Sequence, residues 1–172
     1  IDDMLKNCEI TIDDIDYVGV SEGPGSFTGI RIGVSTGRAL AQVLGKPIVS
    51  VPTLKAMAYN LSMYTGLLCP IMDARRNQVY TAAYKWENQK CSEIIELQSC
   101  MLDDLLNQLQ KHEEIMFLGD GVPAFKEKIR EQLGEKAKFA PQSGGMQKAS
   151  SVAQLGLALI ESKEDTQYYE AH

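Results

Sequence analysis

The sequence EGPGSFTGIRIG, residues 22–33, separates a short apolar run from a long helical pattern and organises the chain around it. The run before it, residues 17–20, is typical of a buried strand. The Gly-Pro-Gly at 23–25 then interrupts the strand, because proline fixes φ and glycine permits backbone angles that other residues resist. Ser26 and Thr28 are residue types that cap helix N-termini. We therefore expect a strand, a tight loop and a helix in that order.

Small residues recur at every fourth position of the expected helix, which runs to about Leu44. They are Gly29, Gly33, Gly37, Ala41 and Gly45. Each glycine inside a helix costs about 1 kcal/mol relative to alanine, so this row needs a compensating contact. Close approach of another backbone would supply it. The row packs either on the domain's own sheet or a neighbouring helix, which is the simpler interpretation, or on a second chain.

Composition restricts the class of protein. The chain has 172 residues, of which 44% are hydrophobic, enough for one sizeable domain or two small lobes. Its net charge of −6 argues against holding nucleic acid by the overall field, although it leaves room for a local basic patch. The four cysteines form no C-x-x-C pair, which indicates reduced thiols. Without a membrane-spanning run or a secretory pattern, we expect a cytoplasmic protein with no membrane association.

The remaining sequence predicts a layered α/β domain with a mixed sheet. Strands are expected at 47–51, 67–72, 79–84, 91–97, 114–119 and 138–140. Helices are expected before Cys8, from 53 to about 64, from 101 to 112, at 123–133 and at 150–162, the fourth being basic and amphipathic. The segment 142–145 is expected to be a flexible loop. The two parts of the domain divide near residues 64–66.

The glycine-rich loop is the first candidate for chemistry. A loop that opens a helix can cradle phosphate, but this one matches neither the G-x-G-x-x-G nor the G-x-x-x-x-G-K-[ST] pattern, which favours a structural turn. Only His112 and His172 could supply imidazole, so we expect no metal site and no cofactor. Ser26 could be imagined as a nucleophile, but G-x-S-x-G is absent and capping explains this serine more simply.

A second polar candidate lies at the end of the 67–72 strand. Asp73, Arg75 and Arg76 place one carboxylate and two guanidinium groups there, where a phosphate-bearing ligand could be met. A salt bridge within the turn, or a contact with a partner, is the interpretation we favour. Together with Arg31 of the first helix, these residues are our candidates for polar contacts.

Three motifs resemble the bacterial TsaB (YeaZ) family. They are GPGSFTGIRIG at 23–33, the helix end GKP at 45–47 and PIMDARR at 70–76. LGDG at 118–121 also looks like the family's second-lobe turn, although it is short. The resemblance covers nearly the whole chain. It implies an actin-like ATPase fold (ASKHA, ribonuclease H-like) with two lobes, residues 1–65 forming the remainder of the N-terminal lobe and 66–172 the C-terminal lobe.

The N-terminal lobe is expected to be incomplete here. TsaB proteins begin with a strand that carries an Asp-Thr motif and with a hairpin, and neither is found before the first helix. The family's final strand is also missing from the pattern, although a closing strand would suit residues 168–172. We therefore expect the sequence to be a part of a longer chain.

The resemblance implies a scaffold or activating subunit that is not itself an enzyme. It pairs with TsaD, and with the ATPase TsaE, for threonylcarbamoylation of the adenosine next to the anticodon in tRNAs that read codons beginning with A. tRNA is reached only through this complex, and a homodimer is the alternative use of the same surface. The signature loop consists of Gly23, Pro24, Gly25, Ser26, Phe27, Thr28 and Gly29, and the candidate interface helix contributes Gly29, Ile30, Gly33, Gly37 and Ala41. The rival hypotheses are an active ASKHA-type phosphotransferase or ATPase and, third, a protease that acts on its partner.

Overall fold

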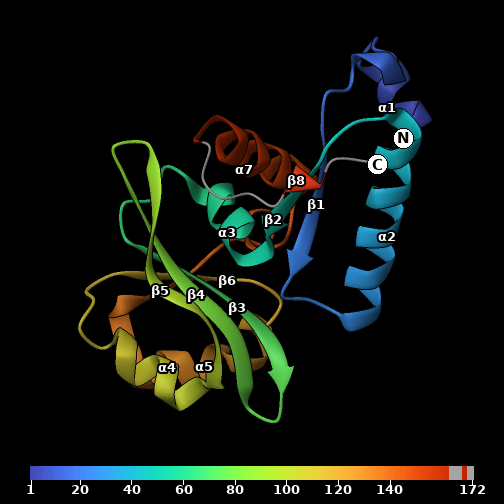
Figure 1. The fold of residues 1–172 in the computed structure, drawn as a ribbon. Coiled ribbons are helices and arrows are strands. Elements are labelled where there is room, and N and C mark those ends of the chain that lie inside the picture. The colour runs from blue at the N-terminus through green and yellow to red at the C-terminus, as the bar shows by residue number, and fades with distance from the viewer. Residues whose placement is uncertain (163–167, 170–172) are drawn as a thin grey trace.

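Two sheets with flanking helices make up the protein. The structure, a computed structural model, describes residues 1–162 and 168–169 (Figure 1). His172, one of the two histidines considered above, lies outside the described residues. A helix, α3 (Thr53–Ala58), lies between the smaller and the larger sheet and contacts both.

The smaller sheet contains the predicted strand–helix–strand unit. β1 (Val18–Gly23) pairs in parallel with β2 (Ile48–Pro52), and α2 (Phe27–Leu44) connects them along the outside of β1 (Figure 1). A two-residue strand, β8 (Tyr168–Tyr169), pairs antiparallel with β2, where we had considered a closing strand plausible. α1 (Asp2–Asn7) and a 3₁₀ turn (Ile12–Asp14) precede β1.

The larger sheet is mixed, as predicted, with the strand order β5-β4-β3-β6-β7. Its strands are β3 (Leu67–Arg75), β4 (Gln78–Glu87), β5 (Lys90–Met101), β6 (Ile115–Leu118) and β7 (Ala137–Phe139). β3 pairs antiparallel with β4 and in parallel with β6. The β4–β5 hairpin is longer than predicted, because its backbone pairing continues from Gln78↔Met101 to Glu87↔Lys90, beyond the residues whose side chains alternate.

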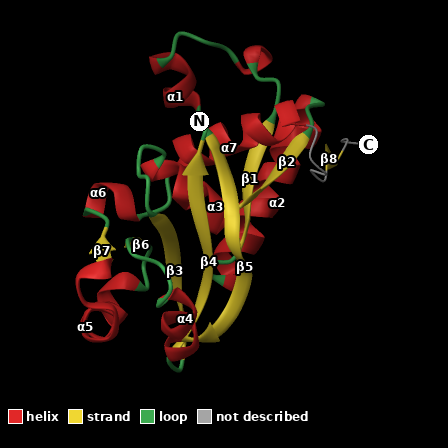
Figure 2. Ribbon diagram, turned by 90° about the vertical axis from the view of Figure 1, so that its left-hand side faces the viewer, coloured by secondary structure: helices red, strands yellow, loops and turns green. Residues whose placement is uncertain are grey.

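Helices cover both faces of the larger sheet. α4 (Leu102–Leu109) and α5 (Val122–Leu133) pack on one face and α3 on the other, while α7 (Ala149–Ser162) lies beside the smaller sheet (Figures 1 and 2). 3₁₀ turns follow α3 (Tyr59–Leu61) and α5 (Gly134–Lys136). The prediction of a loop at 142–145 was wrong: a one-turn helix, α6 (Gln142–Gly145), forms where Gly144 N–H donates to the Pro141 carbonyl. No helix of the described chain is long and apolar enough to cross a membrane.

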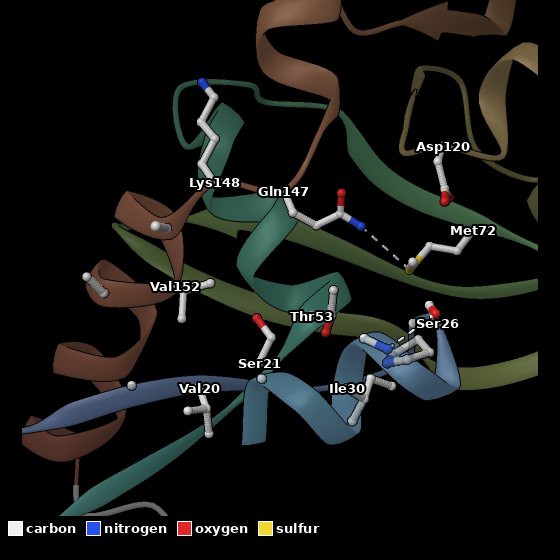
Figure 3. A pocket seen from close by; sticks show the side chains of 17 residues that line it. Val20, Ser21, Ser26, Ile30, Thr53, Met72, Asp120, Gln147, Lys148 and Val152 are labelled. Atoms are coloured by element: carbon white, nitrogen blue, oxygen red, sulfur yellow. Dashed lines mark hydrogen bonds between the residues drawn. The ribbon is translucent and has the colours of Figure 1, made fainter. Parts of the chain in front are cut away.

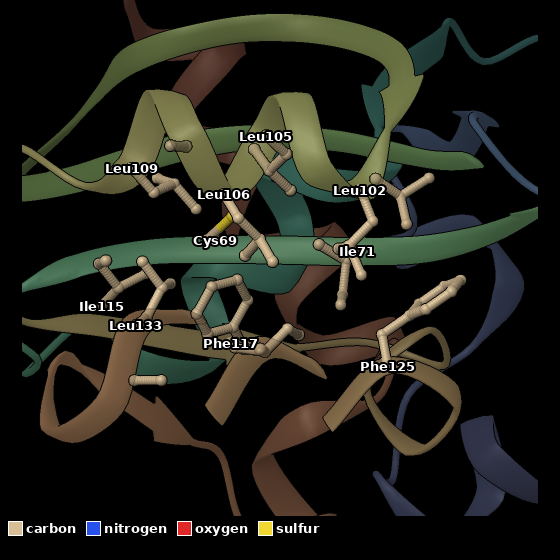
Figure 4. Close-up of a cluster of buried hydrophobic side chains, with 14 of the residues drawn as sticks. Cys69, Ile71, Leu102, Leu105, Leu106, Leu109, Ile115, Phe117, Phe125 and Leu133 are labelled. Carbon is tan, nitrogen blue, oxygen red and sulfur yellow. The ribbon is translucent and has the colours of Figure 1, made fainter. Parts of the chain in front are cut away.

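The core is built around β3, whose first six residues are all buried. Cys69 and Ile71 point to one face, against the four leucines of α4 and Phe117 of β6 (Figure 4). Leu68 and Met72 point to the other face, against α3. A strand covered on both faces explains the continuous apolar run in the sequence. Burial raises the pKa of the Cys69 thiol to about 12, so this thiol is neutral at physiological pH.

The division of the chain at residues 65 and 66 remains a prediction. The change from the smaller to the larger sheet falls between β2 and β3. However, Leu155 and Leu159 of α7 pack against Val49 and Val51 of β2, although α7 comes late in the sequence. We therefore propose that the lobe built on β1 and β2 also includes α7.

Gly119 offers a test of the packing around β3. It follows β6 with φ +108°, and a Cβ at this position would overlap the backbone carbonyl oxygen of Ile71. We expect Gly119→Ala to lower the free energy of unfolding by about 3 kcal/mol, from backbone strain and overpacking. Gly45→Ala is the matched control, since Gly45 also has a positive φ of +62° but open space around it, and should cost only about 1 kcal/mol. Urea unfolding measures both, and equal losses would contradict the packing argument.

Candidate functional site: the cavity beside the glycine loop

The glycine loop joins β1 to α2 through a sharp change of direction. Gly23 has φ +123°, a conformation that side chains rarely adopt, and the Gly23–Pro24 peptide bond is cis. The Ser26 hydroxyl accepts a hydrogen bond from the Gly29 N–H at 3.4 Å, which confirms the predicted helix cap. This contact also occupies one of the N–H donors that a phosphate at the helix start would use.

A cavity of about 700 Å³ opens beside this loop, between the two sheets (Figure 3). One wall is formed by β1, the loop and the first turns of α2. The other walls are formed by the start of α3, the middle of β3, the turn after β6, and the segment that leads into α7. The site therefore combines residues from both ends of the described chain.

The cavity's polar side chains differ in where they point. Thr53 is only 6% exposed, and its hydroxyl points into the cavity without a hydrogen bond to any described residue (Figure 3). Gln147 directs its amide toward the sulfur of Met72, at 3.9 Å, while Lys148 extends away from the cavity (Figure 3). The carboxylate of Asp120 lies on the same side as Met72 (Figure 3). The cavity thus offers two hydroxyls without a hydrogen-bond partner in the described chain, those of Ser21 and Thr53, and one carboxylate, with its lysine directed outward.

The described residues bring together neither a metal-binding group nor a nucleophile with its base. No three His, Cys, Asp or Glu side chains of residues 1–162 and 168–169 gather where they could hold a metal ion. Ser26 is used as a helix cap, and no histidine lines the cavity within the described residues. The arrangement can enclose a ligand with polar groups, but it lacks a paired acid and base.

The signature loop divides between the cavity and the surface. Pro24, Gly25, Ser26 and Gly29 line the cavity. Phe27 is 75% exposed, and the guanidinium of Arg31 lies 5.2 Å from the centre of its ring. Arg31, one of the candidates for polar contacts, is therefore placed on the outer surface of α2.

The row of small residues on α2 also divides. A Cβ at Gly37 would overlap Val20 of β1, and Ala41 is 3% exposed, so both face the sheet of their own chain. A Cβ at Gly33 would meet no atom within 4 Å. Gly29, Ile30 and Gly33 all border the cavity. Gly37 and Ala41 thus pack on the sheet of their own chain, which is the simpler interpretation of the row. Contact of the other small residues of the row with a second chain stays a prediction.

A different row of α2 faces solvent. Ile32 and Val43 are 62% and 84% exposed, and Ala39 lies between them in an exposed position. Their spacing of seven and four residues puts them on one side of the helix. The signal for this row in the sequence is the spacing of its apolar residues.

In the described part of the chain, the turn after β3 does not contain a salt bridge, which is one of the two interpretations that we favour for it. The carboxylate of Asp73 accepts a hydrogen bond from the backbone N–H of Arg75 at 2.7 Å, and no ion pair joins it to Arg75 or Arg76 within the described residues. Arg75, Arg76 and Asn77 have φ values of 66°, 52° and 61°. This left-handed run forms the tight turn of the β3–β4 hairpin. Both arginines are exposed, so a partner contact remains open to them.

Sequence reasoning missed most of the cavity's polar side chains. Thr53, Gln147 and Lys148 belong to none of the quoted motifs, and Met72 and Asp120 lie within two of them without being singled out. Only the fold brings them together.

Comparison with known proteins identifies the family. Residues 1–168 match the family model described as TsaD, tRNA N6-adenosine threonylcarbamoyltransferase. The tRNA threonylcarbamoyladenosine biosynthesis protein TsaB of Bacillus subtilis is 36% identical over 154 residues, which are 89% of this chain and 67% of that protein. The chain belongs to the TsaB branch of the TsaD family. TsaB of Haemophilus influenzae is 30% identical over 144 residues, covering 77% of this chain and 60% of that protein.

The fold agrees with this family. The solved structure of YeaZ from Pseudomonas aeruginosa superposes with a TM-score of 0.79 over 99% of this chain and 77% of that one, at 18% sequence identity. This likeness confirms the α/β fold that the TsaB (YeaZ) resemblance implied. The chain spans between 60% and 69% of the length of three TsaB relatives that it matches, the third being from Buchnera aphidicola.

Two glycines of α2 should respond in opposite ways to the same substitution. Gly33→Ala should raise the free energy of unfolding by up to about 1 kcal/mol, because alanine is the better helix former and the space is open. Gly37→Ala should lower it by about 1 kcal/mol or more, since the new methyl group would overlap Val20. Urea unfolding of the two variants decides. If both variants are stabilised, α2 does not pack on β1 through Gly37.

The Thr53 hydroxyl can be tested against a buried threonine that has a partner. Thr53→Val should leave the free energy of unfolding unchanged or raise it, because the hydroxyl has no protein partner to lose. Thr81→Val should lower it by about 1 kcal/mol, since the Thr81 hydroxyl donates to the Pro70 carbonyl at 3.0 Å. Thermal or urea unfolding measures both. A loss at Thr53 as large as that at Thr81 would contradict the assignment of a free hydroxyl.

Proposed function

We propose that this chain is a subunit of the tRNA threonylcarbamoyladenosine biosynthesis system and pairs with a TsaD-like enzyme. In this role it supports transfer of a threonylcarbamoyl group to the adenosine next to the anticodon in tRNAs that read codons beginning with A. The 36% identity to a protein named for this pathway supports the proposal, as does the match to the TsaD family along residues 1–168.

The exposed face of α2 is the observation that carries the pairing. In a helix of 18 residues, only Gly37 and Ala41 are buried. Ile32, Ala39 and Val43 form an apolar row on the outer side, and the bulky Phe27 is exposed at the start of the helix. Apolar residues that gather on one exposed helix face are typical of a protein interface. We propose that the TsaD-like subunit covers this row, together with the open edge at Gly29, Ile30 and Gly33.

We further propose that the chain acts without catalysing the transfer itself. In support, the cavity's described residues include no metal-binding group and no nucleophile paired with a base. The chemistry would then belong to the TsaD-like partner, and a TsaE-like ATPase would join through the complex. A homodimer would use the same face of α2 when the partner is absent. A tRNA-modifying complex of this kind would work in the cytoplasm.

The cavity favours one rival, an ASKHA-type phosphotransferase or ATPase. Its volume of about 700 Å³ and its place beside the glycine loop would suit a nucleotide. The outward direction of Lys148 and the capping role of Ser26 speak against it (Figure 3). Calorimetry of the full-length chain with Mg-ATP separates the two functions. Tight binding with turnover would favour the rival, whereas no binding alone, with tRNA modification restored on adding the TsaD-like subunit, would favour the subunit role.

Charge placed on the outer row of α2 should break the pairing. We expect Ile32→Glu and Val43→Glu each to weaken binding to the TsaD-like subunit at least tenfold, because a carboxylate would be buried against an apolar surface. Titration calorimetry with the purified partner measures the affinity, and mass spectrometry of reconstituted tRNA modification measures the consequence.

Met63→Glu is the matched control, since Met63 is 92% exposed on a different element and its substitution should change neither readout. Circular dichroism confirms that all three variants are folded. If folded Ile32→Glu and Val43→Glu variants bind the partner as well as the unchanged chain does, the row is not the interface.

A further inference from the structure

A polar hollow of about 500 Å³ lies on the edge of the larger sheet, away from the cavity described above. α5, the 3₁₀ turn after it and the edge strand β7 form it, and these elements adjoin one another in Figure 2. Three of its seven lining residues are the cations Lys126, Arg130 and Lys138, and Glu135 is the only anion among the seven. This local excess of positive charge stands out in a chain whose net charge is −6.

Two of the cations are held in place by an aromatic ring. The Lys126 ammonium lies 5.2 Å from the centre of the Phe139 ring, and the Arg130 guanidinium lies 5.3 Å from it. The ring is itself fixed, because it packs against the buried Phe117 with a centroid distance of 6.0 Å. Cations attracted to an anchored ring lose less rotamer freedom when they bind an anion.

The helix that carries these cations is anchored by packing on the core. Lys126 and Arg130 are four residues apart, so they lie on the same side of α5. The adjoining side buries Phe125, Ile129 and Leu133 in the core. The apolar side of this amphipathic helix therefore packs in the core, and two of its basic residues line the hollow.

The carboxylates nearby neutralise the hollow only weakly. Lys126 has no carboxylate within 4.0 Å among the described residues. Arg130 is 3.5 Å from Glu127, and Lys138 is 3.9 Å from Glu135, whose side chain is fully exposed. Ion pairs as exposed as these contribute little and exchange readily for another anion.

We infer that this hollow binds the phosphate backbone of tRNA when the chain works in its complex. The inference rests on the proposed function, which supplies an RNA as the polyanion. Lys and Arg side chains around a polar hollow are the groups that contact phosphates. No large exposed hydrophobic residue of the described chain lies on α5 or β7, which disfavours a membrane surface. Because the overall charge repels RNA, the contact adds to binding by the partner and does not replace it.

The test measures tRNA binding by the full-length chain in complex with the TsaD-like subunit, at a series of salt concentrations. Lys126→Glu should weaken binding several-fold and lower the slope of log K against log salt by about one, the value for one phosphate contact. The double variant Lys126→Glu/Arg130→Glu should lower the slope by about two. Lys126→Arg keeps the charge and should restore both readouts. Lys90→Glu, which removes an exposed lysine from the start of β5, is the control and should change the slope little.

The possible failures are distinguishable. If the unchanged chain does not bind the TsaD-like subunit or support modification, the proposed function fails. If it does, and the folded double variant binds tRNA with unchanged affinity and salt slope, this inference is wrong. It is also wrong if the double variant loses affinity for the protein subunit while its affinity for tRNA is retained, because the hollow would then be a contact for an acidic protein surface.

Discussion

Burial of β3 on both faces is the constraint on which the rest of the structure depends. Its residues alternate between two clusters, one under α4 and α5 and one under α3, and its neighbours in the sheet run in opposite directions. A strand in this position cannot shift by one residue without exchanging the contents of the two clusters. β3 therefore fixes where α3 lies, and α3 in turn joins the larger sheet to the smaller one. The cavity between the sheets has its shape because β3 forms part of its wall and also positions α3, which contacts the smaller sheet.

The side chain of Asn60 connects the end of α3 to the segment around residues 144–151. Asn60, just after α3, donates hydrogen bonds to the carbonyl oxygens of Gly144 at 3.0 Å and Met146 at 2.7 Å, and accepts one from the Ser151 hydroxyl at 2.6 Å. These contacts hold the segment that carries Gln147 and Lys148, and with it the start of α7, against the 3₁₀ turn that follows α3. The side chain of Lys148 extends from this segment away from the cavity (Figure 3).

The helix after the glycine loop serves two purposes on two sides. Gly37 and Ala41 let it approach β1 closely, which offsets the cost of glycine in a helix. The other side, with Ile32 and Val43, has no counterpart in the described chain and is available to a partner. The basic hollow beside β7 lies on different elements, so the two surfaces can be used at once in a complex.

The sequence by itself determined the strand, loop and helix around residues 22–33, the Ser26 cap, the Gly45 helix end and the mixed α/β class, because each depends on neighbouring residues and on hydrophobic period. It also carried the family signature. Only the tertiary structure decided which glycines face the sheet, that Asp73 binds backbone, and that Thr53 and Asp120 share a cavity. Those outcomes depend on contacts between segments far apart in the chain, and local sequence patterns contain no information about which distant side chain will fill a given space.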